Sequence, residues 1–170
     1  MLGSWSATID PIQLADQGAR LAGELPIKGM SRLVEMCLDD EGTIRVDLQF
    51  ARGSPDGLRV MRGTLDAQVH LTCQRCMGRM TAELHARPQV VLLRPGERED
   101  LLADGDAVVI ERPVTVGALV EDELLLEMPM VPMHPPEECP AALQDSHPAA
   151  PAGTRPNPFS VLQKLKRADR

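Results

Sequence analysis

Aromatic side chains are almost missing from this chain. It has no Tyr, and Trp5, Phe50 and Phe159 are the only members of the Phe, Tyr and Trp class among its 170 residues. Proteins that bind single-stranded RNA through base stacking need several aromatic rings on one surface. The sequence therefore lacks that mode of RNA recognition. Its core is expected to be aliphatic, with Met filling gaps.

A surplus of positive charge is also missing. The chain has 18 Lys and Arg against 25 Asp and Glu, which gives a formal net charge of −7. Binding to nucleic acid through overall electrostatics is thereby disfavoured, because phosphate contacts need clustered cations. Any contact with RNA must be local, and the acidity favours a basic protein partner.

Long apolar runs are absent as well. No stretch approaches the roughly 20 apolar residues of a membrane helix, and residues 1–10 have neither a basic start nor an apolar core. We therefore expect a cytoplasmic protein without a membrane partner. In a reducing compartment, Cys37, Cys73, Cys76 and Cys139 are first considered as thiols or metal ligands rather than disulfides.

Three segments alternate apolar and polar residues with a period of two, namely 44–50, 65–71 and 80–86. This alternation is typical of strands with one buried face. The length suits one folded unit with a core. The expected fold class is α+β, an antiparallel β-rich single domain that contains a Cys-x-x-Cys hairpin.

One or two packing helices are expected beside the sheet. Residues 11–21 have loosely helical apolar spacing, with Asp10 as a possible N-cap. A clearer amphipathic helix covers 116–124, with Pro129 as its stop. The acidic run within it, Glu121, Asp122 and Glu123, lies mostly away from the apolar face. Such runs are usually solvated rather than catalytic.

The C-terminal part has a different composition. We assign 1–139 to the α+β domain, 140–155 to a Pro- and Ala-rich flexible linker, and 156–170 to a short basic amphipathic helix. In that helix an apolar stripe lies beside cationic residues: Phe159, Leu162, Leu165, Lys164, Lys166 and Arg167. So short a helix should become ordered only on its own core or on a partner. The alternative is a solvated tail.

The cysteine motif is the main candidate for chemistry. Cys73 and Cys76 enclose a tight turn between two predicted strands, and Gly78 could adopt positive φ there, as in a zinc knuckle. Structural zinc needs four Cys or His ligands. His134 and Cys139 follow the long helix and would complete a Cys3His set. The alternatives are reduced, partly buried thiols, or a redox pair, which flanking strands make less suitable.

Evidence for catalysis is missing from the sequence. It shows no nucleophile with a plausible base, no paired carboxylates on a suitable element and no Gly-rich phosphate loop. We expect a protein that is not an enzyme and has no small-molecule substrate. Cys37, among apolar neighbours, is expected to be an inert core thiol.

Several motifs occur together in one order. They are Leu-Thr-Cys-Gln-Arg-Cys at 71–76, the helix running into Pro-Met-Val-Pro-Met-His at 129–134, Cys139, and Pro-Asn-Pro-Phe-Ser-Val-Leu-Gln-Lys-Leu-Lys at 156–166. This succession resembles the YceD family, the large ribosomal RNA subunit accumulation proteins, nearly end to end. The resemblance implies a role in synthesis, processing or stability of 23S ribosomal RNA, without an established enzymatic activity.

The resemblance also bears on the metal ligands. Cys73 and Cys76 match the family's Cys-x-x-Cys, and His134 stands where other branches place a Cys that begins a further Cys-rich segment. That exchange suits metal ligation. Those branches have additional cysteines after this point, whereas here only Cys139 remains.

We therefore expect a non-catalytic assembly factor that contacts pre-ribosomal large-subunit RNA, a basic ribosomal protein, or both. Glu121, Asp122 and Glu123 would face a basic protein, and the C-terminal cations would touch RNA. Two competing hypotheses remain open. One is a zinc-dependent hydrolase or nuclease with an open metal position, and the other is a thiol redox protein.

Overall fold

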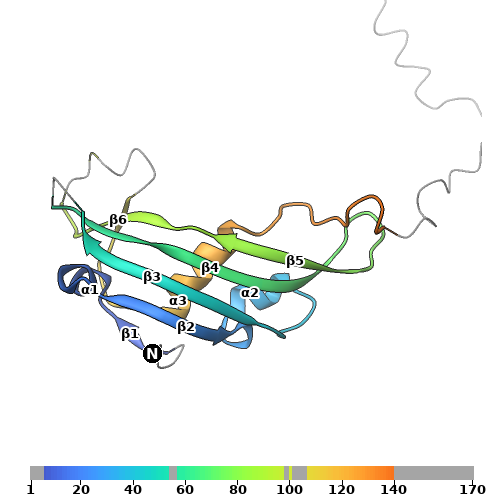
Figure 1. Cartoon of the computed structure of the whole chain (residues 1–170), viewed down its shortest axis with the longest axis horizontal. Coiled ribbons are helices and arrows are strands. Elements are labelled where there is room, and N and C mark those ends of the chain that lie inside the picture. The colour runs from blue at the N-terminus through green and yellow to red at the C-terminus, as the bar shows by residue number, and fades with distance from the viewer. Residues whose placement is uncertain (1–5, 54–56, 98–99, 101–106, 140–170) are drawn as a thin grey trace, which may run out of the picture.

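The computed structural model describes residues 6–53, 57–97, 100 and 107–139. A six-stranded sheet forms the body of this region, in the order β2-β3-β4-β6-β7, with β5 also paired to β4 (Figure 1). Its strands are β2 (Arg20–Pro26), β3 (Thr43–Arg52), β4 (Arg59–Thr72), β5 (Arg79–Ala86), β6 (Gln89–Leu93) and β7 (Ala107–Val109). All pairs in this sheet are antiparallel except β6–β7, which is parallel.

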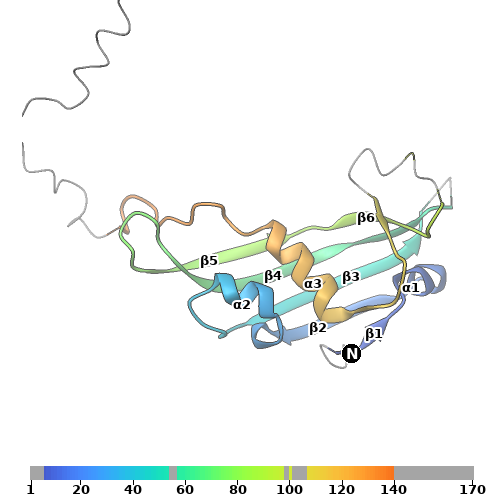
Figure 2. The same cartoon turned by 180° about the vertical axis from the view of Figure 1, so that it is seen from behind.

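The remaining elements are short. Strands β1 (Thr8–Ile9) and β8 (Val114–Thr115) form a separate antiparallel pair. The helices are α1 (Pro11–Gln17), the 3-10 turn η1 (Ile27–Gly29), α2 (Ser31–Met36) and α3 (Val116–Leu126). Helices α2 and α3 lie on the same face of the sheet (Figure 2). The predicted α+β, mainly antiparallel fold is confirmed.

The core lies between that face and the helices. Along β3 the apolar residues Ile44, Val46, Leu48 and Phe50 are buried while their neighbours lie outward, as the period of two predicts. Helix α3 covers them with Val116, Val120 and Leu124. Among the described residues, no helix is long and apolar enough to cross a membrane.

Helix α1 begins as predicted and ends earlier. The Asp10 carboxylate accepts hydrogen bonds from the backbone N–H groups of Ile12 and Gln13. Gly18, at φ 65°, closes the helix in the left-handed conformation. The prediction of a helix over 11–21 is therefore wrong at its C-terminal end, because the chain from Arg20 onwards pairs with β3.

Strand β4 changes its partner midway. Residues 65–72 pair with β5 and residues 59–62 pair with β6, so these two strands follow one another along one side of β4. The change occurs at Gly63, whose N–H donates to the carbonyl of Pro88 at 3.1 Å. A Cβ on Gly63 would lie 2.9 Å from the Cα of Leu48 on β3. The close approach of β3 to β4 therefore requires glycine here.

Candidate metal centre

The four predicted ligands converge at one end of the sheet. Cys73 and Cys76 lie in the hairpin between β4 and β5, while His134 and Cys139 belong to the segment after α3. One ligand atom from each residue lies within 4.8 Å of the other three. The expected approach of the two distant segments is confirmed.

Backbone hydrogen bonds shape the hairpin around the sulfurs. The N–H of Cys73 donates to the carbonyl of Gly78 at 2.9 Å, and the N–H of Met77 donates to the carbonyl of Cys73 at 2.8 Å. The left-handed residue is Met77, at φ 58°, so the prediction that Gly78 takes positive φ is wrong. Gly78 lies close to the cluster, since a Cβ there would lie 3.4 Å from the Cys76 Sγ.

Two hydrogen bonds donated by backbone N–H groups help to attach the segment after α3 to this hairpin. The N–H of Gln74 donates to the carbonyl of Pro132 at 2.8 Å. The N–H of His134 donates to the Cys73 Sγ at 3.4 Å. A tight turn then follows, in which the N–H of Cys139 donates to the carbonyl of Pro135 at 3.2 Å. These contacts aim the last two ligands at the first two.

The imidazole of His134 is oriented by its second nitrogen. Its Nε2 lies 3.0 Å from the backbone carbonyl of Arg79, and its Nδ1 lies 3.4 Å from the Cys76 Sγ. A carbonyl can only accept, so Nε2 carries the hydrogen and Nδ1 presents its lone pair to the cluster. Ligating histidines usually have such a partner on the other ring nitrogen.

The two buried thiols have opposite pKa shifts. Burial raises the pKa of Cys73, but backbone N–H groups of Cys76, His134 and Arg75 outweigh it and lower the pKa to about 5. Burial raises the pKa of Cys139, and the adjacent sulfurs of Cys76 and Cys73 raise it further. A divalent cation among the sulfurs would favour the thiolate at every one of these positions.

The donor set suits a closed tetrahedral zinc site. Three sulfurs and one imidazole are ligand types that structural zinc prefers, and four of them fill its shell. Cys73 is 0% exposed and Cys139 is 5% exposed, so water has little access to those two sulfurs.

Comparisons with known proteins decide the family. The family model described as "Large ribosomal RNA subunit accumulation protein YceD" matches residues 61–166. A Haemophilus influenzae protein with that same name is 30% identical over 170 aligned positions, covering 94% of each chain. This chain belongs to the YceD family. No solved structure matches it.

One of the acidic residues expected on the surface of this YceD-family protein is buried. Glu121 on α3 accepts hydrogen bonds from the backbone N–H groups of Arg32 and Leu33 and from the Arg32 guanidinium. The prediction that Glu121 belongs to a solvated partner-binding face is therefore wrong, because its carboxylate is used inside the fold. Asp122 is exposed, although it also contacts Arg32, and Glu123 is half-buried.

A second polar cluster beside the metal centre escaped the sequence analysis. Asp39, Glu41 and His70 lie together, and Asp39 Oδ1 is 3.0 Å from His70 Nδ1. The guanidinium of Arg79 already contacts the other Asp39 oxygen at 3.0 Å. Because the Arg79 guanidinium supplies the positive charge beside Asp39, the cluster is an ion-paired network rather than a second metal site. His70 is distant in sequence from Asp39 and Glu41, and the three residues form no motif that could have revealed the cluster.

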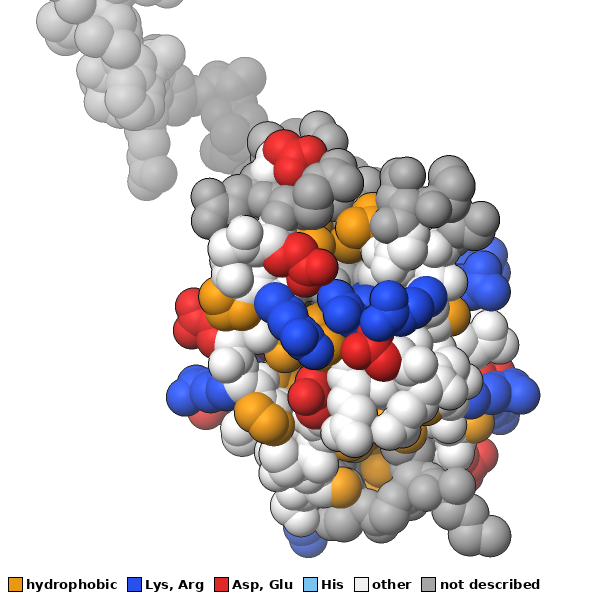
Figure 3. All heavy atoms as spheres, turned by 90° about the vertical axis from the view of Figure 1, so that its left-hand side faces the viewer, with side chains coloured by type: hydrophobic (Ala, Val, Ile, Leu, Met, Phe, Trp, Pro, Cys, Tyr) orange, Lys and Arg blue, Asp and Glu red, His pale blue; other side chains and the backbone are white. Residues whose placement is uncertain are grey.

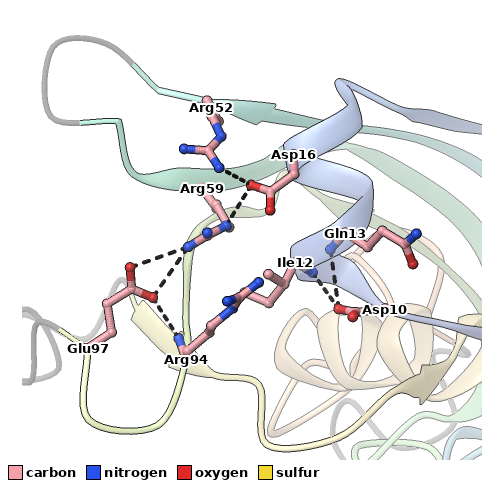
Figure 4. Close-up of polar contacts among 8 residues, drawn as sticks. All are labelled: Asp10, Ile12, Gln13, Asp16, Arg52, Arg59, Arg94 and Glu97. Atoms are coloured by element: carbon pink, nitrogen blue, oxygen red, sulfur yellow. Dashed lines mark hydrogen bonds and ion pairs between the residues drawn. The ribbon is translucent and has the colours of Figure 1, made fainter.

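The opposite end of the sheet contains a further charge network, in which arginines and carboxylates alternate on the surface (Figure 3). Asp16 on α1 accepts from Arg52 at 2.7 Å and from Arg59 at 2.8 Å (Figure 4). Glu97 contacts Arg59 and accepts from the backbone N–H of Arg94 at 3.0 Å. These pairs connect α1 to strands β3 and β4 and to the end of β6. Because these arginines and carboxylates pair with one another, we assign the network a structural role.

The predicted linker at 140–155 and the C-terminal helix at 156–170 lie outside the described residues. The same holds for Phe159, Leu162, Lys164, Leu165, Lys166 and Arg167. Their assignment to partner binding stays a prediction.

Proposed function

We propose that this protein is a non-catalytic factor that supports the accumulation of 23S ribosomal RNA during large-subunit biogenesis, and that structural zinc closes its fold. The names of the family model and of the Haemophilus influenzae relative support the ribosomal role. The convergence of Cys73, Cys76, His134 and Cys139 is the observation that carries the zinc assignment.

The proposed zinc would cross-link two parts of the chain. Residues 127–139 contain no helix or strand, and individual hydrogen bonds, such as those to Gln74 and Cys73, connect them to the hairpin. A metal bound to all four residues would hold this segment against β4 and β5. Such binding energy contributes directly to folding, because the site does not exist in the unfolded chain.

Partner contacts are assigned by charge. Pre-ribosomal large-subunit RNA and a basic ribosomal protein remain the proposed partners. Of the acidic residues on α3, exposed Asp122 and half-buried Glu123 are the ones left to attract a basic protein, since Glu121 is buried. The C-terminal cations would touch RNA. A cytoplasmic location would keep the three cysteine ligands reduced.

The coordination shell of the metal distinguishes the proposed structural site from the site of an enzyme. A hydrolase or nuclease would show three protein ligands and a metal-bound water. A redox protein would cycle a disulfide between Cys73 and Cys76. The low pKa of Cys73 suits a redox thiol as well as a metal ligand, but burial of its sulfur restricts attack by a substrate.

The first experiment is a tagged pull-down from cells, combined with sedimentation of ribosomal particles. The wild type should comigrate with large-subunit precursors, and a Cys73→Ser, Cys76→Ser double variant should lose this association. Cys37→Ser is the matched control, because Cys37 lies outside the ligand cluster. Absence of wild-type protein from all ribosomal material would contradict the ribosomal role.

The zinc assignment is tested on the purified protein. Elemental analysis should find one zinc per chain, and X-ray absorption should show three sulfur ligands and one nitrogen ligand. A shell completed by water would reopen the hydrolase hypothesis. A metal-free protein with a reversible Cys73–Cys76 disulfide would favour the redox hypothesis.

A further inference from the structure

An apolar groove lies beside the metal centre. It has a volume of ≈ 290 Å³ and is formed by the end of α2, the last residues of β4 and the segment after α3. These elements meet on one face of the sheet, next to the β4–β5 hairpin (Figure 2). Buried Leu71 forms part of its lining, together with the side chains of Met36, Leu38, Met128 and Met130.

Exposed apolar side chains gather around this groove. Met36 is 55% exposed, Leu38 is 49% exposed and Met130 is 99% exposed. All other strongly exposed large apolar residues of the described region, except Val108, belong to the hairpin or to residues 126–133. Met36, Leu38 and Met130 all line the groove, and exposed apolar side chains gathered at one groove are typical of an interaction site. Methionine adapts its shape to an incoming side chain, which suits a groove that is filled after the sheet has folded.

Two acidic residues are the sequence neighbours of groove-lining methionines, since Glu35 precedes Met36 and Glu127 precedes Met128. Glu35 on α2 and Glu127 after α3 are both exposed, and no ion pair is found for either among the described residues. Of the nearby cations, Arg32 pairs with Glu121 and Arg79 with Asp39, whereas Arg75 contacts the Met133 Sδ and has no ion pair among the described residues. An occupant with apolar anchors and basic neighbours therefore fits best.

The chain itself carries such an occupant. We propose that the C-terminal segment, residues 157–167, docks into this groove of the same molecule through Phe159, Leu162 and Leu165. Lys164 and Lys166, beside these anchors, supply the charge opposite to that of Glu35 and Glu127. Docking would provide the folded surface that so short a helix needs in order to form.

The point where the described chain ends supports docking within one molecule. Cys139 is its last residue, and its Sγ lies within 4.8 Å of the Cys73 Sγ. The next residue after Cys73, Gln74, lines the groove. Residues 140–156 link Cys139 to the segment, and a chain of that length can span from on the order of 20 Å as a random coil to on the order of 50 Å as extended polyproline. An attached segment therefore reaches the groove at a high effective concentration, before any second molecule does.

The test is hydrogen–deuterium exchange on the full-length, zinc-loaded protein, and it needs no ribosomal partner. Amides of 157–167 should exchange at least tenfold more slowly than an unstructured chain. Met130→Asp and Leu38→Asp should abolish that protection, because a carboxylate would enter the apolar groove. Val108→Asp should leave the protection unchanged, because Val108 lies on β7 outside the groove and has nearly the same exposed fraction as Leu38.

A reciprocal variant guards against misfolding of the groove. Phe159 lies outside the described residues, so Phe159→Asp should leave the amides of the sheet protected. If the segment docks, the same variant should speed amide exchange around 126–133, because the groove loses its occupant. Free exchange of 157–167 in the wild type would overturn the proposal, as would protection that survives both groove variants. Protection that appears only together with a dimeric mass would show docking between two copies and would also overturn it. None of these outcomes depends on the ribosomal role.

Discussion

Glu121 on α3 caps the first turn of α2 across the fold. Its Oε1 accepts from the backbone N–H of Arg32 at 2.7 Å and from that of Leu33 at 3.1 Å, and its Oε2 accepts from the Arg32 guanidinium. Helix α2 has no side-chain cap of its own, since Met30 occupies its N-cap position. A carboxylate from another helix therefore satisfies the N–H groups that a local cap would otherwise bind.

Glu121→Ala should lower the free energy of unfolding by about 2–3 kcal/mol, because it leaves buried N–H groups without an acceptor. Denaturant unfolding measures the effect. Asp122→Ala is the matched control, since its exposed ion pair with Arg32 should be worth less than about 1 kcal/mol. Equal losses of unfolding free energy in the two variants would show that the Glu121 cap contributes no more than an exposed ion pair.

The acidic-face hypothesis requires variants that spare Glu121. Reversal of charge in an Asp122→Lys, Glu123→Lys double variant should slow association with large-subunit precursors roughly tenfold at low salt, because electrostatic steering is lost. Glu137→Lys with Glu138→Lys, exposed positions outside α3, is the charge-matched control. Binding kinetics at two salt concentrations measure the effect. An unchanged association rate in the α3 variant would rule out a role for Asp122 and Glu123 in binding the partner.

Gly63→Ala should destabilise the sheet by about 1–3 kcal/mol, because the added methyl group meets the backbone of Asp47 and Leu48. Thr64→Ala, the exposed next residue, should change stability by less than about 0.5 kcal/mol. Thermal unfolding of both variants checks the difference. A Gly63→Ala protein as stable as the wild type would show that the two strands separate readily.

His85 should make stability depend on pH. Its hydrogen bond to Asp66, at 2.8 Å, and its approach to Glu83 raise the pKa of this imidazole above its ordinary value. The stabilisation is fully present below the unfolded pKa of about 6.5 and is lost as the pH rises through the raised folded pKa. His85→Gln should flatten the curve of unfolding free energy against pH in that window. A slope that persists in this variant would assign the dependence to another group.

Removal of metal should loosen the segment after α3. If zinc contributes about 3 kcal/mol, a strong chelator should lower the Tm by about 6–12 °C. The Cys139→Ser variant should start from a lower Tm and respond less to the chelator, whereas Cys37→Ser should behave as the wild type. A wild-type Tm that ignores the chelator would contradict a structural metal.

Local patterns in the sequence predicted strands β3, β4 and β5, the α3 helix and the Cys-x-x-Cys hairpin, but not the shorter strands or β2. The alternation at 44–50 suffices for a strand because one face of β3 is buried, and Asp10 with Pro11 marks the start of α1 by local capping. The end of α1 was not predictable in this way. From Arg20 onwards the chain forms β2 and pairs with β3, and this pairing joins parts of the chain that are distant in sequence.

The sequence by itself determined which residue types are available: three thiols and an imidazole suited to zinc, and an aliphatic core without aromatic platforms. Tertiary structure decided how they are used. It brings His134 and Cys139 to the hairpin, and it buries Glu121 against Arg32, 89 residues away. The physical reason is that helix and strand periodicity shows only which face of its own element a residue lies on. The partner on that face depends on the packing of segments that the pattern treats separately.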